Sequence, residues 1–417
     1  MSRSEHPWTM MLALVIAGEA IFALPFVLIR VFRPTVLEVF EIDNTQLGVA
    51  FSFYGTVAMG SYLFGGPLAD RFPARNLMAT ALLTTAAGGL FFYTMPSLRM
   101  LEWLYGYFGL TTILLFWAAM LRATREWGGE DAQGRAYGLL DGGRGLVGAL
   151  ISTVSVGLFA WMLPDAANAT LEAKRAALQS AILYFTLGTA LAAGVVWWLI
   201  PHRETPPAAV DEPRFNLRQV GRVLRMPTLW LQAVIVICAY VGYKGTDDFS
   251  LLASDALGYD DVQAASVGTA VLWVRPLAAV GAGVLADRLV GSQVILVSFV
   301  ALIGGNLLIA AFAGAGLTVL LLVTIFASTA FVYGLRGVYF AVFNEARVPV
   351  AVTGTAVGVV SLTGYTPDVF FGPLMGVLLD SNPGVQGHQN LFYVLALFSL
   401  VGALTTLVFR WASRRAA

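Results

Sequence analysis

The hexapeptide GPLADR occupies residues 66–71, at the point where a long apolar run of the chain ends. A closely similar hexapeptide, GVLADR, occupies residues 283–288, again at the end of an apolar run. Two copies of one small, acidic and basic pattern, each placed after a hydrophobic segment and half a chain apart, indicate an internal repeat. We therefore expect a protein built from two related halves.

The composition indicates a membrane protein. Of the 417 residues, 58% are hydrophobic and 12% are charged, whereas about 25% are charged in ordinary soluble domains. A soluble fold of this size cannot bury so much apolar surface, and repeated apolar stretches of about 20 residues are typical of bilayer-spanning helices. We expect an all-α protein surrounded by lipid. The formal net charge is +0, which gives no reason to expect a nucleic-acid partner.

The sequence contains no pattern typical of a cofactor or an enzyme. Its three histidines and single cysteine, Cys238, show no metal-ligand spacing. It also lacks a Gly-x-x-x-x-Gly-Lys-Ser/Thr stretch for a nucleotide phosphate and an intramembrane nucleophile–base pair. We expect no bound metal or cofactor and no enzymatic activity, so that energy for any transport comes from a gradient.

Hydropathy predicts twelve membrane-spanning helices in two six-helix bundles related by a pseudo-twofold axis. The longest polar interruption, residues 201–222, is rich in proline and charge and is the natural linker. We therefore expect a bundle at 1–200, a cytoplasmic linker at 201–226 and a second bundle at 227–417. The predicted spans are 8–32, 45–69, 76–96, 99–122, 135–163, 177–200, 227–248, 262–286, 292–313, 316–343, 350–379 and 389–411.

The arginines and lysines predict the orientation. Most of them fall on segments that share the side of the N-terminus, and the opposite loops hold only Arg33, Arg99, Lys174 and Arg175. Because cytoplasmic loops are enriched in lysine and arginine, we expect both termini in the cytoplasm. The expected location is the bacterial inner membrane, and the expected oligomeric state is a monomer.

The twelve spans, the central loop and the doubled Gly-x-x-x-Asp-Arg pattern resemble the major facilitator superfamily over essentially the whole chain. The stretch FVLIR, residues 26–30, followed by TQLGVAFSFYG, residues 45–55, is loosely similar to the organophosphate/anion antiporter branch. In that branch an arginine of helix 1 binds phosphate, and Arg30 is the matching position. The resemblance thus implies a transporter with Arg30 in its substrate site.

The resemblance also implies two gating clusters. In the family, the glycine lets helices approach closely, and the aspartate faces the N-terminal end of a helix from the other half. By position, Asp70 is expected near Gly354 and Asp287 near Gly134. A carboxylate at a helix N-terminus is favoured by roughly 0.3–1 kcal/mol. The implied gating residues are Gly66, Asp70, Arg71, Gly283, Asp287 and Arg288.

Three charged side chains lie deep inside predicted spans. Insertion of such a side chain at the centre of a bilayer costs about 2.5–3.5 kcal/mol, so we expect each of the three to have a structural or functional role. Arg275 and Arg336 can clamp an anion bidentately, or they can neutralise Glu19 or an outer aspartate. Glu19 can carry a proton or a cation, because a buried isolated carboxyl takes up a proton readily, or it can form a permanent salt bridge.

Two further groups of charges are candidates for gates. Asp141 and Arg144 are three residues apart and can face each other on helix 5, which favours an inner gate over substrate contact. Helix 7 ends with Lys244, Asp247 and Asp248, which we interpret as an outer-gate cluster, with solvation at the interface as the alternative.

Aromatic residues in membrane proteins mostly pack helices or lie at the lipid interface. Tyr243 and Tyr333 lie at a depth similar to the charged residues and are the aromatic candidates for substrate contact.

These features predict a secondary active transporter for a small polar, anionic metabolite, working by alternating access. A proton, another ion or a counter-substrate gradient would drive it. The alternative is a transporter-like receptor that senses a small ligand. A receptor needs a surface for its output, and the central linker at 201–222 is the main candidate in this chain.

Overall fold

The computed structural model describes residues 8–129, 133–202, 221, 224–286, 290–339, 345 and 353–415. Within these ranges the chain forms helices and no strand, which confirms the all-α prediction. Within the described residues, ten continuous helical stretches are long and apolar enough to cross a membrane. Some of these stretches, such as Trp8–Phe40, comprise more than one of the elements named below. The other two predicted spans, 262–286 and 350–379, correspond to helix α12 and to the pair α15 and α16. That the chain crosses the membrane twelve times, and that a pseudo-twofold axis relates its two halves, remain predictions.

Each predicted span of the N-terminal part corresponds to one or more helices of the structure. Two of the spans contain π-helical segments, η1 and η2, in which the backbone is locally widened. The bounds are α1 Trp8–Phe22, η1 Ala23–Val27, α2 Leu28–Phe40, α3 Asn44–Ala69, α4 Ala74–Tyr93, α5 Leu98–Gly109, η2 Leu110–Trp117, α6 Ala118–Gly128, α7 Gln133–Met162, η3 Ala166–Asn168 and α8 Leu171–Leu199.

The described C-terminal part is also built from helices. One predicted span is interrupted by a short 3-10 segment, η4, and another is divided at Tyr365 and Thr366. The bounds are α10 Pro227–Gly245, η4 Thr246–Asp248, α11 Phe249–Leu257, α12 Asp261–Ala286, α13 Gly291–Phe312, α14 Thr318–Val338, α15 Thr353–Gly364, α16 Pro367–Ser381 and α17 Val385–Arg415.

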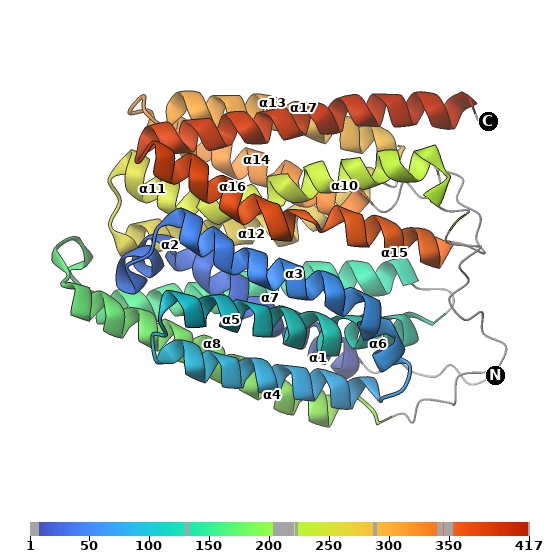
Figure 1. The fold of residues 1–417 in the computed structure, drawn as a ribbon, viewed down its shortest axis with the longest axis horizontal. Coiled ribbons are helices and arrows are strands. Elements are labelled where there is room, and N and C mark those ends of the chain that lie inside the picture. Colours follow the sequence, from blue (N-terminus) through green and yellow to red (C-terminus); the bar gives the residue numbers. More distant parts are fainter. Residues whose placement is uncertain are drawn as a thin grey trace.

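The helices form two sets that lie one above the other in Figure 1. The N-terminal set, α1–α8, is blue to green, and the C-terminal set, α10–α17, is yellow-green to red. Two apolar clusters lie almost entirely in the first set, where Ala265 and Leu272 of α12 join one of them. Two others lie in the second set. The domain boundaries at residues 200 and 227 stay a prediction.

The two ends of the molecule differ in what they contain. The start of α1 and the end of α17 lie at one end, on the right of Figure 1, which we call the termini side. The loops that follow α2 and α11 lie at the opposite end, which we call the far side.

Two predicted spans end well before the helices that they predict. The span predicted at 8–32 continues as α2 to Phe40, through Pro34 and a kink at Phe32, whose φ is −108° and ψ is 28°. Arg33, expected in an outer loop, is therefore fully buried, and its Nη2 donates to Asn44 Oδ1 at 2.8 Å. The span predicted at 227–248 likewise continues through η4 and α11 to Leu257. Charged residues and a proline end an apolar window, but they do not end these helices.

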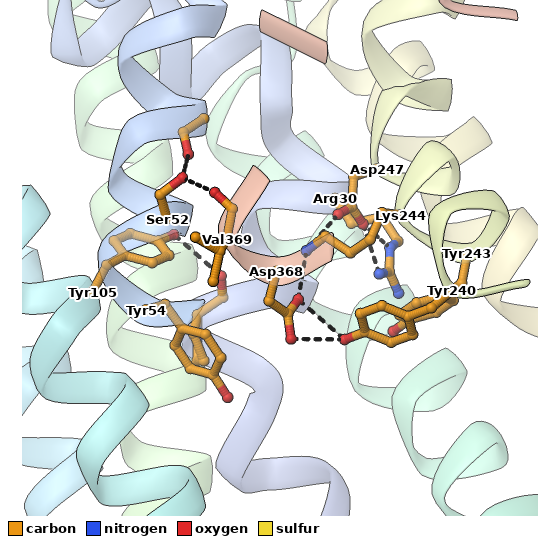
Figure 2. A network of polar contacts seen from close by, with 12 residues as sticks. Arg30, Ser52, Tyr54, Tyr105, Tyr240, Tyr243, Lys244, Asp247, Asp368 and Val369 are labelled. Atoms are coloured by element: carbon orange, nitrogen blue, oxygen red, sulfur yellow. Dashed lines mark hydrogen bonds and ion pairs between the residues drawn. The ribbon is translucent and has the colours of Figure 1, made fainter. Parts of the chain in front are cut away.

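On the far side the two sets touch through α3 and α16, which run side by side across the middle of Figure 1. A Cβ atom on Gly48 would lie 2.3 Å from the Gly372 carbonyl oxygen, and one on Gly376 would lie 2.4 Å from the Thr45 Cα. Only glycine allows two backbones to come this close. The Ser52 hydroxyl also donates to the Val369 carbonyl oxygen, a contact drawn in Figure 2.

Candidate functional site

A cavity lies between the two sets of helices and comprises about 740 Å³ of space, part of which is open to solvent. Both π-helical segments line it, which agrees with the tendency of such segments to occur at functional sites. Aromatic side chains from both sets of helices form a large part of the cavity wall. The N-terminal set supplies Glu19, Phe22, Phe26, Val27, Arg30, Tyr54, Tyr62, Ile113, Trp117 and Arg144, and the C-terminal set supplies Tyr240, Tyr243, Lys244, Arg275, Arg336, Tyr365 and Asp368.

The charges around the cavity do not balance. Two further carboxylates, Asp141 and Asp247, bind lining cations from just outside the wall. Among the residues that the structure describes, these and the two acidic lining residues make four carboxylates against five cations, which leaves one positive charge in excess. The five cations are Arg30, Arg144, Lys244, Arg275 and Arg336, and the acidic lining residues are Glu19 and Asp368.

Arg275 joins the two sets of helices by binding two carboxylates. Its Nη1 lies 3.2 Å from Glu19 Oε2, and its Nη2 lies 2.9 Å from Asp141 Oδ1. Arg144 approaches the same Glu19 oxygen, with its Nε at 3.6 Å. Asp141 and Arg144, predicted to face each other, therefore have other partners in the described structure. Glu19 and Arg275 are therefore arranged as a salt bridge, which the sequence offers as the alternative to a proton carrier at Glu19 and an anion clamp at Arg275.

A second charged group crosses the sets nearer the far side. Arg30 of α2 binds Asp247 of η4, with Nε and Nη2 lying 2.7 Å and 2.6 Å from Oδ1. Lys244 Nζ lies 3.4 Å from Asp247 Oδ2 and 3.6 Å from Asp368 Oδ1. Figure 2 shows Lys244 between these two carboxylates. Lys244 and Asp247 are each 2% exposed, so they are not solvated at an interface.

Asp248, grouped with Lys244 and Asp247 from the sequence, points elsewhere. Its Oδ2 lies 2.7 Å from His388 Nδ1, and the other ring nitrogen of His388 lies 3.1 Å from Asp255 Oδ2. All three residues belong to the C-terminal set. This network ties α11 and α17 together and is separate from the residues that line the cavity.

Arg336 is the lining cation whose described contacts include no carboxylate. Its guanidinium carbon lies 3.8 Å from the centre of the Tyr243 ring and 5.8 Å from that of Tyr240. Arg30 lies near the same Tyr243 ring, at 4.8 Å. Tyr333 packs against Tyr243 at 6.2 Å, and its buried hydroxyl has no hydrogen-bond partner among the described atoms. Cation–π contacts of this kind stabilise a guanidinium without neutralising its charge.

Asp368 is a site residue that the sequence analysis missed. It lies inside the predicted span 350–379, so the criterion that singles out Glu19 also applies to it. The Tyr240 hydroxyl lies 3.1 Å from both carboxylate oxygens of Asp368. Figure 2 shows this hydroxyl directed at the carboxylate. Tyr54, Tyr62 and Tyr365 line the same region.

The first copy of the repeated motif lies at the termini side, and the predicted contact of Asp70 is not found among the described residues. A Cβ atom on Gly66 would meet nothing within 4 Å, and the Asp70 and Arg71 side chains are exposed. No hydrogen bond or ion pair of the Asp70 carboxylate occurs among the described residues. Gly283 lies in α12, and Asp287 and Arg288 lie outside the described residues. The predicted inner gate therefore stays a prediction.

A helical membrane protein with a charged cavity between two sets of helices has the architecture of a membrane transporter. The sequence profile of the Major Facilitator Superfamily matches residues 11–366. The chain belongs to the Major Facilitator Superfamily, and it is an integral membrane transporter rather than an enzyme.

Relatives and solved structures agree with this assignment. The chain is 25% identical to inner membrane protein YqcE of Escherichia coli (strain K12), over 98% of this chain and 96% of YqcE. It is 23% identical to inner membrane protein YihN of the same organism, over 97% and 96%. The nucleoside transporter NupG has a similar fold, with a TM-score of 0.73 at 15% identity over 96% and 98% of the two chains. A bacterial homologue of the human lysosomal transporter Spinster, in an inward-facing and occupied conformation, gives 0.71 at 14% identity over 96% of each chain.

Proposed function

We propose that the protein is a secondary transporter that moves a small anionic metabolite through the central cavity. The observation that carries this proposal is Arg336, a lining cation without a carboxylate among its described contacts. A part-buried guanidinium retains its charge and presents a planar fork of donors, which matches a carboxylate or a phosphate. An anion bound there would also neutralise the excess charge of the cavity.

We propose that transport uses alternating access. On the far side the two sets are joined by polar contacts: the Thr35 hydroxyl donates to Asp261 at 2.6 Å, and Lys174 binds Asp261 at 2.8 Å. Within the described part of the chain, Asp70 and Arg71 of the motif at the termini side show no such contact. This supports a state that is closed on the far side. With the termini in the cytoplasm, as the arginine distribution predicts, it is an inward-facing state.

The test of the substrate class is a thermal-shift screen of the purified protein. A ligand that binds the native state selectively raises the unfolding temperature. The probes are glucose 6-phosphate, gluconate and succinate, with glucose and uridine as neutral compounds. The proposal predicts stabilisation by at least one of the anions. Stabilisation by uridine or glucose alone would contradict it and would favour a neutral substrate.

Variants of Arg336 connect any binding to the cavity. Arg336→Gln removes the charge and should lower anion affinity by about tenfold or more, since a charge-assisted hydrogen bond contributes about 1.5–3 kcal/mol. Arg336→Lys keeps the charge but loses the planar fork, so its affinity should lie in between. Arg99→Gln, at an exposed position, is the control for the change in total charge. Equal affinities in Arg336→Gln and the wild type would remove Arg336 from the site.

A further inference from the structure

We propose that Asp368 is the residue that binds a proton together with the anion, so that the protein carries out symport. The proposal rests on the proposed function, because it names the coupling residue of the same cavity. It replaces Glu19, the sequence-based candidate, with a carboxyl group whose contacts permit it to gain and lose a proton.

The four carboxylates around the cavity differ in their cationic partners. A carboxylate held by a guanidinium stays ionised, because arginine does not give up its proton in proteins. Glu19 is held by Arg275, and Asp141 is held by the other end of the same guanidinium. Asp247 is held by Arg30 at 2.6 Å. Each of these three carboxylates is therefore paired with an arginine.

Asp368 alone of these four has no arginine among its described contacts. Its cationic neighbour is Lys244, whose Nζ lies 3.6 Å away, beyond ordinary hydrogen-bond length. Lys244 also has other partners, since it lies 3.4 Å from Asp247 and 4.8 Å from the centres of the Phe26 and Phe51 rings. Protonation of Asp368 therefore leaves Lys244 paired with Asp247 and still in contact with both rings.

The groups facing Asp368 from each neighbouring helix fit this role. From α10, the Tyr240 hydroxyl can donate to the ionised carboxylate or accept from the protonated one. From α3, Tyr54 and Tyr62 line the same cavity and are uncharged hydroxyls. Helix α17 packs on α16 through Phe398, which contacts Phe370 and Phe371. None of the described contacts of α17 brings a charge to Asp368.

The charge balance connects the proton to the anion. With Asp368 ionised, the five cations and four carboxylates leave the cavity with one excess positive charge, and a proton on Asp368 raises the excess to two. Tyr240 links the two sites, because its hydroxyl meets Asp368 while its ring contacts Arg336. A proton from water that binds the Asp368 carboxylate thus favours anion binding at Arg336. By linkage, the bound anion favours the proton equally.

The position of Asp368 also suits the transfer of a proton from one side of the membrane to the other. A Cβ atom on Gly55 of α3 would lie 2.5 Å from the Asp368 carbonyl oxygen. Asp368 therefore lies where the two sets touch, and any separation of α3 from α16 changes its surroundings. On release, the anion leaves Arg336 and the carboxyl group returns its proton to water, so that one proton moves with each anion.

Infrared difference spectroscopy tests proton binding without a substrate. The protein is reconstituted in lipid and compared between about pH 5 and pH 9, a range in which an unperturbed aspartate stays ionised. The wild type should show the carbonyl stretch of a protonated carboxylic acid at the lower pH. Asp368→Asn should lose this band, and Glu19→Gln should retain it. A band that persists in Asp368→Asn, or disappears only in Glu19→Gln, would overturn the assignment.

A second variant covers the case in which Asp368→Asn fails to fold, as judged by circular dichroism. Asp368→Glu keeps the carboxyl group but moves it by one methylene, so the frequency of the band should shift. An unshifted band would overturn the assignment. The coupling itself is measured as anion affinity against pH, with whichever of glucose 6-phosphate, gluconate and succinate stabilises the protein.

In the wild type, anion affinity should fall by about fivefold or more from pH 5 to pH 9, the usual lower range for coupled sites. In Asp368→Asn it should be independent of pH, and a wild-type pH profile in that variant would contradict coupling through Asp368. If no anion binds at all, the proposed function fails. The infrared result then still decides whether Asp368 binds a proton.

Discussion

The Asp380 carboxylate, at the end of α16, accepts hydrogen bonds from the backbone N–H and the hydroxyl of Thr45, at 2.7 Å and 2.6 Å. It also accepts from the backbone and side-chain nitrogens of Asn44, at 3.1 Å and 3.0 Å. Asn44 and Thr45 begin α3, whose first N–H groups have no partner within the helix. A carboxylate of the C-terminal set thus caps a helix of the N-terminal set. Asp70 was predicted to make a contact of this kind, but it lies at the other end of α3.

Removal of this cap should weaken closure of the far side. In Asp380→Asn the charge is lost, and the loss of hydrogen bonds to a charged, part-exposed group is worth about 1–2 kcal/mol. The form closed on the far side should then lose about tenfold in population relative to other forms. The measurement is the rate at which a maleimide labels a cysteine introduced as Ser52→Cys, in a Cys238→Ala background. Ser52 lies on α3, and its side chain contacts Val369 of α16.

Asp260→Asn is the matched control for this prediction. Asp260 also caps a helix, since its carboxylate accepts from the backbone N–H groups of Val262 and Gln263, but these residues all belong to the C-terminal set. Its loss should lower the unfolding temperature slightly without changing the labelling of Ser52→Cys. Equal labelling rates in the Asp380→Asn protein and the wild type would show that the cap does not hold the far side closed.

The glycine contact between α3 and α16 should be equally sensitive to size. Gly48→Ala places a methyl group 2.3 Å from the Gly372 carbonyl oxygen, so the two helices must separate. We expect faster labelling of Ser52→Cys and a loss of transport. Gly60→Ala, on the same helix, places its methyl group where nothing lies within 4 Å and should behave like the wild type. If both alanine variants behave alike, close packing of α3 on α16 is not required for closure.

The salt bridge between Glu19 and Arg275 should be a stability element. Both residues are buried, at 4% and 8% exposure, and removal of one partner from a buried pair typically costs about 3–5 kcal/mol. Arg275→Met should therefore lower the unfolding temperature strongly, and the Glu19→Gln/Arg275→Met double variant should recover part of the loss. A double-variant effect equal to the sum of the single effects would show that the two residues do not interact.

The ring and the hydroxyl of Tyr240 should have separable effects. Tyr240→Phe keeps the aromatic face near Arg336 but removes the hydroxyl that contacts Asp368. Anion affinity at low pH should therefore stay close to that of the wild type, while the dependence of affinity on pH changes. The measurement is isothermal calorimetry across pH, with Tyr107→Phe, an exposed tyrosine of α5, as control. An unchanged pH profile in Tyr240→Phe would show that its hydroxyl does not affect the proton site.

The positions of the spans could be predicted because apolar length alone determines what crosses a bilayer. Glu19, Arg275 and Arg336 could be found because a charge stands out in an apolar segment, and all three line the cavity. Their partners could not be found, because residues 256 positions apart, such as Glu19 and Arg275, meet only through the packing of the two sets.

Other features needed the structure for specific physical reasons. Arg33 and Pro34 resemble a helix end, yet tertiary packing buries the arginine and extends the helix over both. Asp248 follows Asp247 directly, but the two carboxylates diverge to His388 and Arg30. Asp380 lies just beyond the predicted span 350–379, and its contact with α3 depends on how α16 is placed.

Accumulation in proteoliposomes directly tests whether a proton gradient drives anion transport. Protein is reconstituted with a more acidic exterior, and uptake of whichever radiolabelled anion stabilised the protein is followed over time. Proton-driven anion transport predicts accumulation above the external concentration in the wild type and collapse of the anion gradient when a protonophore is added. It also predicts no accumulation in Arg336→Gln. Uptake that stops at equal concentrations, or that is unchanged in Arg336→Gln, would contradict an anion carrier driven by protons.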